Sequence, residues 1–215
     1  MTPYPRSKRA FSLVEILVVL AIMSILMGIG MKAFSGQGSQ EFSKGLSQLS
    51  GALELAQAQS LSTRNLIRLL IAMDDQDLVI LSLTYTGDAS ASEEKINSDD
   101  DSTWTPTAKP LIIKNMKLNE EFIPQIEDFS LLSEGTPLGI TRNVAGKEVQ
   151  FESMIQFSPQ GEASLNSVKK IGRGIQCGVQ SLGTKPQKAI IRISSLTGRI
   201  EVLREESFAT AASSQ

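Results

Sequence analysis

The chain has 215 residues and a nearly balanced charge, with 21 Lys and Arg against 23 Asp and Glu. A net charge of -2 excludes a general electrostatic attraction to nucleic acid or anionic lipid. The sequence holds no His and one Cys, which excludes an intramolecular disulfide and the common nucleophile–base and paired metal-ligand patterns. We therefore expect neither an enzyme nor a bound cofactor or metal, and we expect Cys177 to be a small buried residue.

A nearly uncharged apolar run covers residues 11–31. As an α-helix, these 21 residues would be about 32 Å long, close to the thickness of the hydrocarbon core of a bilayer. Three basic residues, Arg6, Lys8 and Arg9, precede the run, and only Lys32 follows it closely. By the positive-inside rule, the N-terminus stays in the cytoplasm and the chain beyond about residue 35 lies outside it.

Glu15 is the one charged residue within this apolar run. A carboxylate inside a membrane helix costs about 2.5–3.5 kcal/mol on insertion scales and is kept where it has a partner. The run contains no second charge, so the partner has to come from elsewhere. A free amine, made by cutting the chain before Phe11 in a neighbouring copy, would be well placed.

A basic leader at residues 6–10 is followed by Phe11, and Glu15 is the fifth residue counted from Phe11. This arrangement resembles the N-terminus of the prepilin family. The resemblance implies that a prepilin peptidase cuts between Ala10 and Phe11 and methylates the new amine of Phe11. It also implies that this amine neutralises Glu15 between adjacent subunits of a filament. Ala10 stands where the family usually has Gly, which bears on the efficiency of cleavage.

Three other interpretations of the apolar run fit the sequence less well. A secretory signal peptide would need a small-residue cleavage site, and residues 32–35 fit one poorly. A plain membrane anchor fits the length of the run but gives Glu15 no role. A buried helix of a soluble protein does not need an uninterrupted apolar run of this length.

Helical periodicity resumes after residue 41. Apolar residues recur at spacings of three and four, namely at Phe42, Leu46, Leu49, Leu53 and Ala56. The spacing predicts an amphipathic helix, which we take as the second half of a long N-terminal helix whose first half crosses the membrane.

Strand patterns begin at residue 66. Two apolar runs, 66–73 and 78–85, flank Asp74-Asp75-Gln76-Asp77 and predict a β-hairpin. Further strands are predicted at residues 111–113, 149–157, 174–181, 189–194 and 199–203. The order predicts an α+β fold in which the long N-terminal helix packs on an antiparallel β-sheet or sandwich.

The predicted elements are a helix ending at Arg64-Asn65, a hairpin, the turn at residues 157–161 and a closing strand after Thr197-Gly198. This order resembles that of the H-type minor pseudopilins of type II secretion and related minor pilins. Residues 86–147 show no such resemblance. They include an acidic, Ser-rich insertion at about 86–110, whose spacing matches no calcium-binding loop, so we expect a solvated loop and not a metal site.

We divide the chain into a leader (1–10), a membrane and filament-core helix (11–35), an extracytoplasmic pilin-like domain (36–208) and a disordered tail (209–215). Lys169, Lys170 and Arg173 could contact phosphates. However, acidic residues lie nearby and no aromatic residues are interleaved in the sequence, so ordinary surface charge is the preferred interpretation.

The resemblance implies a minor pseudopilin, a structural subunit of a type II secretion pseudopilus or a related type IV pilus-like filament. Its implied partners are prepilin peptidase, other pseudopilins, an inner-membrane assembly platform and the lipid bilayer. The chain would cross the inner membrane once, with its N-terminus in the cytoplasm and its C-terminal domain in the periplasm or in an extracytoplasmic filament. The alternative is a minor pilin that binds DNA or a surface during DNA uptake, adhesion or motility.

Overall fold

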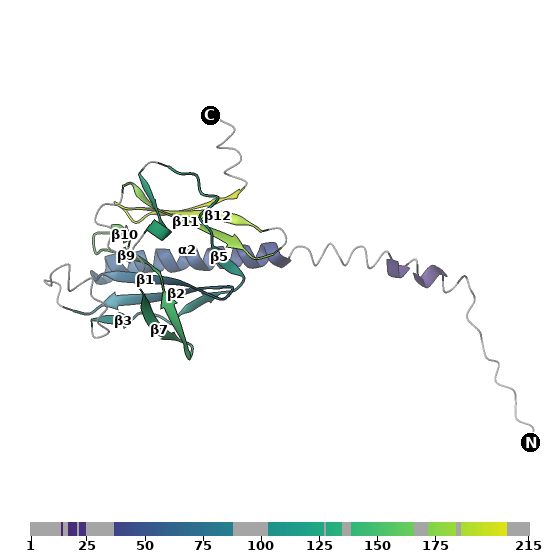
Figure 1. Cartoon of the computed structure of the whole chain (residues 1–215), viewed down its shortest axis with the longest axis horizontal. Coiled ribbons are helices and arrows are strands. Elements are labelled where there is room, and N and C mark those ends of the chain that lie inside the picture. The colour runs from purple at the N-terminus through teal and green to yellow at the C-terminus, as the bar shows by residue number, and fades with distance from the viewer. Residues whose placement is uncertain are drawn as a thin grey trace, which may run out of the picture. The chain divides into compact units, whose positions relative to one another are not determined.

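The computed structural model describes residues 14, 17–20, 22–24, 37–87, 103–126, 128–134, 139–165, 172–183 and 186–205. The chain divides into two compact units, Met1–Gln40 and Glu41–Gln215. The described residues are mostly in β-sheet, and all the strands belong to the second unit (Figure 1). The first half of the predicted long helix, residues 11–35, falls largely outside the described residues.

Helix α2 runs from Gln37 to Thr63 and confirms the predicted amphipathic helix. All five predicted apolar positions are buried, namely Phe42, Leu46, Leu49, Leu53 and Ala56. The helix ends where Arg64 takes a left-handed conformation with φ of 55°, a common way to terminate a helix. Its buried stripe packs on strands of both large sheets, and Figure 1 shows the helix passing between them.

Sheet A has six strands in the order β10-β9-β1-β2-β3, with β4 also pairing with β2. All its pairs are antiparallel. Its strands are β1 (Ile67–Asp74), β2 (Asp77–Tyr85), β3 (Trp104–Pro106), β4 (Leu111–Ile113), β9 (Ser153–Phe157) and β10 (Ala163–Leu165). The predicted hairpin is confirmed as β1–β2, with Asp74 paired to Asp77 across a two-residue turn.

Sheet B has five strands in the order β13-β12-β11-β5, with β6 also pairing with β11. Its strands are β5 (Met116–Leu118), β6 (Phe129–Leu131), β11 (Gly174–Ser181), β12 (Lys188–Ser194) and β13 (Ile200–Arg204). The sheet departs from the predicted antiparallel pattern at one place, because β6 runs parallel to β11. A short 3₁₀ helix, η1 (Leu132–Glu134), follows β6.

The prediction of one strand over residues 149–157 was wrong. The structure has β8 (Lys147–Phe151) and β9 (Ser153–Phe157), which belong to different sheets and meet at Glu152. Strand β8 pairs with β7 (Ile140–Val144) in a separate hairpin. Every second residue is buried up to Phe151, but the next buried residue is Met154, which is one position out of step with that alternation. A shift of one residue places the apolar side chains on the other face of a strand.

Two apolar clusters hold the second unit together. The larger lies between the sheets and contains the buried stripe of α2. The smaller lies on the opposite face of sheet A, where Val149 and Phe151 of the β7–β8 hairpin pack on Leu70 and Leu81. The region 86–147 is therefore no separate lobe in its described part, since it supplies β3 and β4 to sheet A, β5 and β6 to sheet B, and β7 to the hairpin.

Candidate assembly segment and surface groove

Most of the predicted site residues fall outside the described part of the chain. These are the leader bases Arg6, Lys8 and Arg9, the processing site Ala10 and Phe11, the intramembrane Glu15, and two of the candidate phosphate contacts, Lys169 and Lys170. Arg173 is described.

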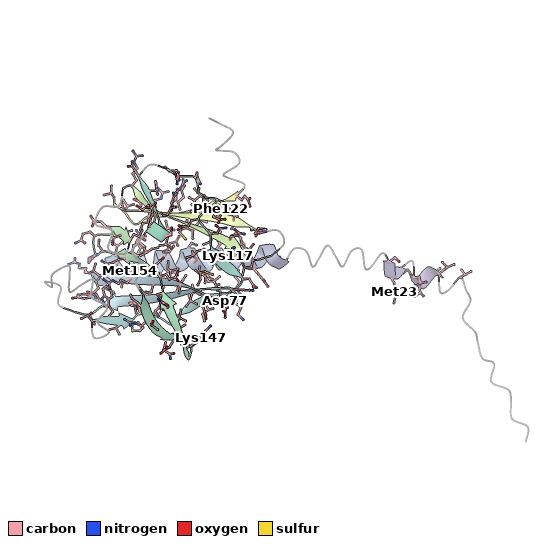
Figure 2. The ribbon with its side chains drawn as sticks, in the orientation of Figure 1. Met23, Asp77, Lys117, Phe122, Lys147 and Met154 are labelled. Atoms are coloured by element: carbon pink, nitrogen blue, oxygen red, sulfur yellow. The ribbon has the colours of Figure 1, made fainter. Side chains whose placement is uncertain are left out.

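The described residues nearest to Glu15 are helical and apolar on every side. Val14, Leu17–Leu20, Ile22 and Met23 have exposed fractions between 49% and 66%, and Figure 2 shows Met23 among them. Successive residues of an α-helix point about 100° apart, so the four residues 17–20 cover most of the circumference. A helix that is hydrophobic all round is normally covered by lipid or by other helices.

Ser24 follows this segment, and its hydroxyl donates to the carbonyl of Leu20 at 2.8 Å. Ser24 is the one polar residue in the described part of this segment, and this bond satisfies its hydroxyl within the helix. No helix formed by the described residues is long and apolar enough to cross a membrane.

Arg173 forms an ion pair with Asp128 at 3.3 Å, and both side chains are more than half exposed. Its charge is therefore already paired. Sequence reasoning missed the aromatic neighbours of the basic residues on β12: Lys188 lies over the ring of Phe122 at 5.3 Å, and Arg192 lies over that of Phe129 at 5.7 Å. Phe122 lies between β5 and β6 and Phe129 begins β6, so both rings are far from β12 in the sequence.

Cys177 lies in the larger core cluster with 5% of its surface exposed, which confirms the prediction of a buried residue. Burial disfavours the thiolate and raises the pKa of this thiol far above its usual range, with a smaller contribution from Glu120. The thiol is therefore protonated and unreactive in the folded chain.

An ion pair joins the tips of two hairpins. Lys147, labelled in Figure 2, lies at the tip of β7–β8, and its ammonium contacts Asp74 at 2.5 Å and Asp75 at 3.5 Å in the β1–β2 hairpin. The hydrogen bond to Asp74 is the main reason why the pKa of Lys147 is raised. The contact links the β7–β8 hairpin to the turn of the β1–β2 hairpin at the surface.

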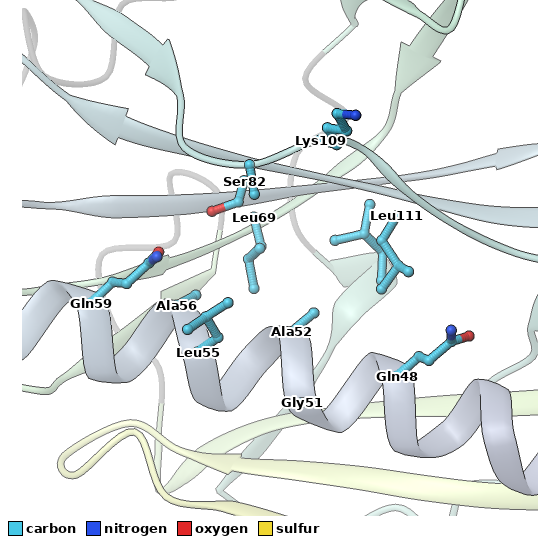
Figure 3. A pocket seen from close by; sticks show the side chains of 12 residues that line it. Gln48, Gly51, Ala52, Leu55, Ala56, Gln59, Leu69, Ser82, Lys109 and Leu111 are labelled. Carbon is cyan, nitrogen blue, oxygen red and sulfur yellow. The ribbon is translucent and has the colours of Figure 1, made fainter.

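A groove of about 260 Å³ runs between α2 and sheet A. Figure 3 shows Ala52 and Leu55 of the helix facing Leu69 and Leu111 of the sheet, with Gln48 and Gln59 at the two ends. Lys109, at the rim, is the one charged side chain in the lining. Sequence reasoning used the helical spacing only to predict the buried stripe, and it missed the uncharged positions Gly51, Ala52 and Leu55 beside that stripe, which line the groove.

The acidic stretch of the insertion lies outside the described residues from position 88 to 102, so the expected solvated loop stays a prediction. Within the part of the chain that the structure does describe, no group of three or more metal-ligating side chains is found.

Comparison with known proteins identifies the N-terminal segment. Residues 5–31 match the family model described as the prokaryotic N-terminal methylation motif. No curated protein and no solved structure matches the chain. The motif includes Ala10, Phe11 and Glu15, and it implies processing by a prepilin peptidase and assembly into pilin-type filaments. Residues 5–31 thus carry the N-terminal motif of a prepilin-type, type IV pilin-like protein.

Proposed function

We propose that the chain is a non-enzymatic minor subunit of a pilin-type filament, most similar to the H-type minor pseudopilins of type II secretion. The observation that carries this proposal is the methylation motif at residues 5–31, which has Glu15 as its single acidic residue after the leader. The second unit supports it with an amphipathic helix, a β1–β2 hairpin after that helix, and a closing β12–β13 hairpin.

The proposed processing begins with cleavage between Ala10 and Phe11 and continues with methylation of the new amine. The amine of one copy then lies against Glu15 of the next. In an apolar filament core this pairing removes the cost of an isolated carboxylate, which is about 2.5–3.5 kcal/mol on insertion scales. Phe11 and Glu15 would thereby set the register between neighbouring subunits.

Before assembly, the chain is held in the inner membrane with its N-terminus in the cytoplasm and its second unit in the periplasm. The described apolar side chains at positions 14, 17–20, 22 and 23, which are exposed on all sides of the helix, support this anchoring role. Recruitment into the filament by an assembly platform transfers these side chains from lipid to neighbouring subunits.

The nucleic-acid alternative gains no comparable support. Arg173 is paired with Asp128, and Lys188 and Arg192 each cover one face of the rings of Phe122 and Phe129. Bases that stack on a protein need free aromatic faces. We therefore keep the structural role as the proposed function.

The test compares Glu15→Gln with Glu54→Gln, which neutralises an exposed carboxylate on α2. Each full-length variant is expressed with a prepilin peptidase and the other filament subunits. Mass spectrometry should show a methylated chain beginning at Phe11 in every case. We expect Glu15→Gln to insert in the membrane and be lost from filaments, and Glu54→Gln to assemble normally. A native product that retains residues 1–10, or normal assembly of Glu15→Gln, would contradict the proposal.

A further inference from the structure

Strand β13 forms an open edge of sheet B. It pairs with β12 on one side, and the residues that the structure describes place no strand on its other side. The Ser194 amide donates to the Arg199 carbonyl, which fixes the alternation of hydrogen bonds in this antiparallel ladder. By that alternation, every second residue of β13 bonds to β12. The residues between them turn their N–H and C=O groups to the open edge, namely Ile200, Val202 and Arg204.

These outward backbone groups are unoccupied. Within the described part of the chain, no backbone hydrogen bond reaches Ile200, Val202 or Arg204 from outside sheet B. A row of free N–H and C=O groups at a sheet edge is a template for one more strand, and proteins block the edges that must stay single.

The two edges of sheet A are blocked in this way. The sheet ends in β3 on one side and in β10 on the other. Because the Thr107 amide donates to the Ser82 carbonyl, the neighbouring Pro106 faces the edge, and proline has no N–H to offer. In β10, the Ala163 amide already donates to the Ser195 carbonyl at 2.9 Å. The edge at β13 has neither kind of block.

Helix α2 runs beside β13 and gives an added strand a surface to lie on. The Arg204 guanidinium donates to the Ser43 hydroxyl at 3.1 Å, and the Gln57 side chain donates to the Thr197 carbonyl at 2.6 Å. These bonds hold β13 along about 21 Å of the helix, at 1.5 Å per residue. Ser47 is small, and its hydroxyl bonds to the Ser43 carbonyl at 2.9 Å, so the helix surface is low beside the edge.

The side chains of β13 indicate the composition of the partner. Ile200 and Val202 are partly buried and pack against the larger cluster, so apolar residues on the inner face of an added strand would extend that cluster. On the outer face, Glu201 is exposed and forms no ion pair with Arg192, which is opposite on β12. Its carboxylate suits a Lys or Arg of the partner. A second β13 would bring another Glu201 to this face, where like charges repel.

We propose that β13 accepts an extended segment of a different filament subunit, which adds to sheet B as a sixth strand. Backbone hydrogen bonds supply the affinity, and the apolar inner side chains and basic outer side chains of that segment supply the specificity. Because the occupant is another protein, the contact joins one partner and does not propagate, as suits a minor subunit. The inference rests on the proposed filament function and adds a contact of the second unit to the pairing at Phe11 and Glu15.

Amide hydrogen exchange tests the edge without any substitution. The amides of Glu201 and Leu203 bond to β12 and serve as internal references for those of Ile200 and Val202. In the full-length chain alone in detergent, we expect the two outward amides to exchange about tenfold or more faster than the references. In filaments assembled with the other subunits, we expect all four to be protected. Mass spectrometry with residue-level fragmentation measures the exchange.

A proline substitution provides the second measurement. Val202→Pro removes an outward N–H but no hydrogen bond to β12, and an edge strand tolerates proline at such a position. Val202→Ala is the matched control, because it shortens the same side chain and keeps the N–H. Urea unfolding in detergent compares the stability of the two variants. At similar stability, we expect Val202→Pro to enter filaments about tenfold less than Val202→Ala.

The outcomes separate this inference from the proposed function. If the wild-type chain enters filaments while the amides of Ile200 and Val202 still exchange fast, the inference is overturned and the proposed function stands. Equal incorporation of Val202→Pro and Val202→Ala has the same meaning. Protection of the outward amides in the chain alone would show that its own tail or a second copy covers the edge, which also overturns the inference. If the wild-type chain enters no filament, both fail.

Discussion

The orientation of α2 can be tested with two leucines that lie two residues apart. Leu53 is 2% exposed and belongs to the cluster between the sheets, whereas Leu55 is 54% exposed at the groove. We expect Leu53→Ala to lower the free energy of unfolding by about 2.7–5 kcal/mol, since it removes a buried side chain and leaves a cavity. Leu55→Ala should change it by no more than about 0.5 kcal/mol.

The comparison is well controlled because both changes replace the same residue in the same helix, so the difference in helix propensity cancels. The assay is urea unfolding of the full-length chain in detergent, followed by the fluorescence of its single tryptophan. Trp104 suits this purpose: it is 3% exposed, its ring lies 3.8 Å from the Arg68 guanidinium, and it contacts Tyr85. Equal losses for the two variants, or a larger loss for Leu55→Ala, would refute the assigned burial of the helix.

Three further predictions concern the second unit. Asp75 has φ of 55° in the β1–β2 turn, so Asp75→Val should lower the free energy of unfolding by about 1–2 kcal/mol while Asp75→Gly leaves it nearly unchanged, as measured by the same unfolding assay. Cys177 should resist a thiol reagent in the folded chain and react after unfolding, so rapid labelling of the native chain would disprove its burial. Folding raises the pKa of this thiol, so only the unfolded chain loses the proton just above the usual thiol pKa of about 8.5. The free energy of unfolding should therefore fall as the pH rises above that value. Lys147→Ala should lower the urea midpoint slightly, and the difference should shrink in high salt. It should also shrink as the pH rises above about 10.4, where the lysine of the unfolded chain loses its proton, and vanish once the pH passes the raised pKa of Lys147 in the folded chain. A difference insensitive to salt would argue against this contact.

Local features of the fold could be predicted from the sequence. The stripe of α2 repeats with the period of a helix, and its five apolar positions are all buried. The hairpin β1–β2 forms between runs that are adjacent in the chain, around a turn rich in Asp. Strands β11 and β12 were also predicted nearly to their ends, because both are long and carry apolar residues at alternate positions.

Features that depend on distant partners could not be predicted. Strand β1 pairs with β9, and β11 pairs with β5 and with β6, although no local pattern distinguishes these partners from others. Several missed strands have only three residues, too few to show alternation. The groove was missed because its lining combines α2 with Leu69, Ser82 and Leu111 from three different strands, and no local pattern shows that these residues meet.

For the candidate site, the sequence was informative at the N-terminus and nearly silent elsewhere. Glu15 is recognisable because a carboxylate within an apolar run is rare, and the matched motif includes it. The rings beneath Lys188 and Arg192 gave no such signal, because Phe122 and Phe129 lie more than fifty residues before them in the chain.

The pairing of β1 with β9 sets the order of events during biosynthesis. Ile67 of β1 pairs with Phe157 of β9, which follows about 90 residues later in the chain. Ribosomes add roughly 5–20 residues each second, so β1 lacks its second partner strand for several seconds during synthesis. Throughout that interval the apolar face of α2 lacks β9 of sheet A and β11 and β12 of sheet B, which cover it in the folded chain. The nascent chain is therefore open to chaperone capture and to aggregation until its final third emerges, and synonymous changes that slow translation before residue 157 should lower the yield of folded protein.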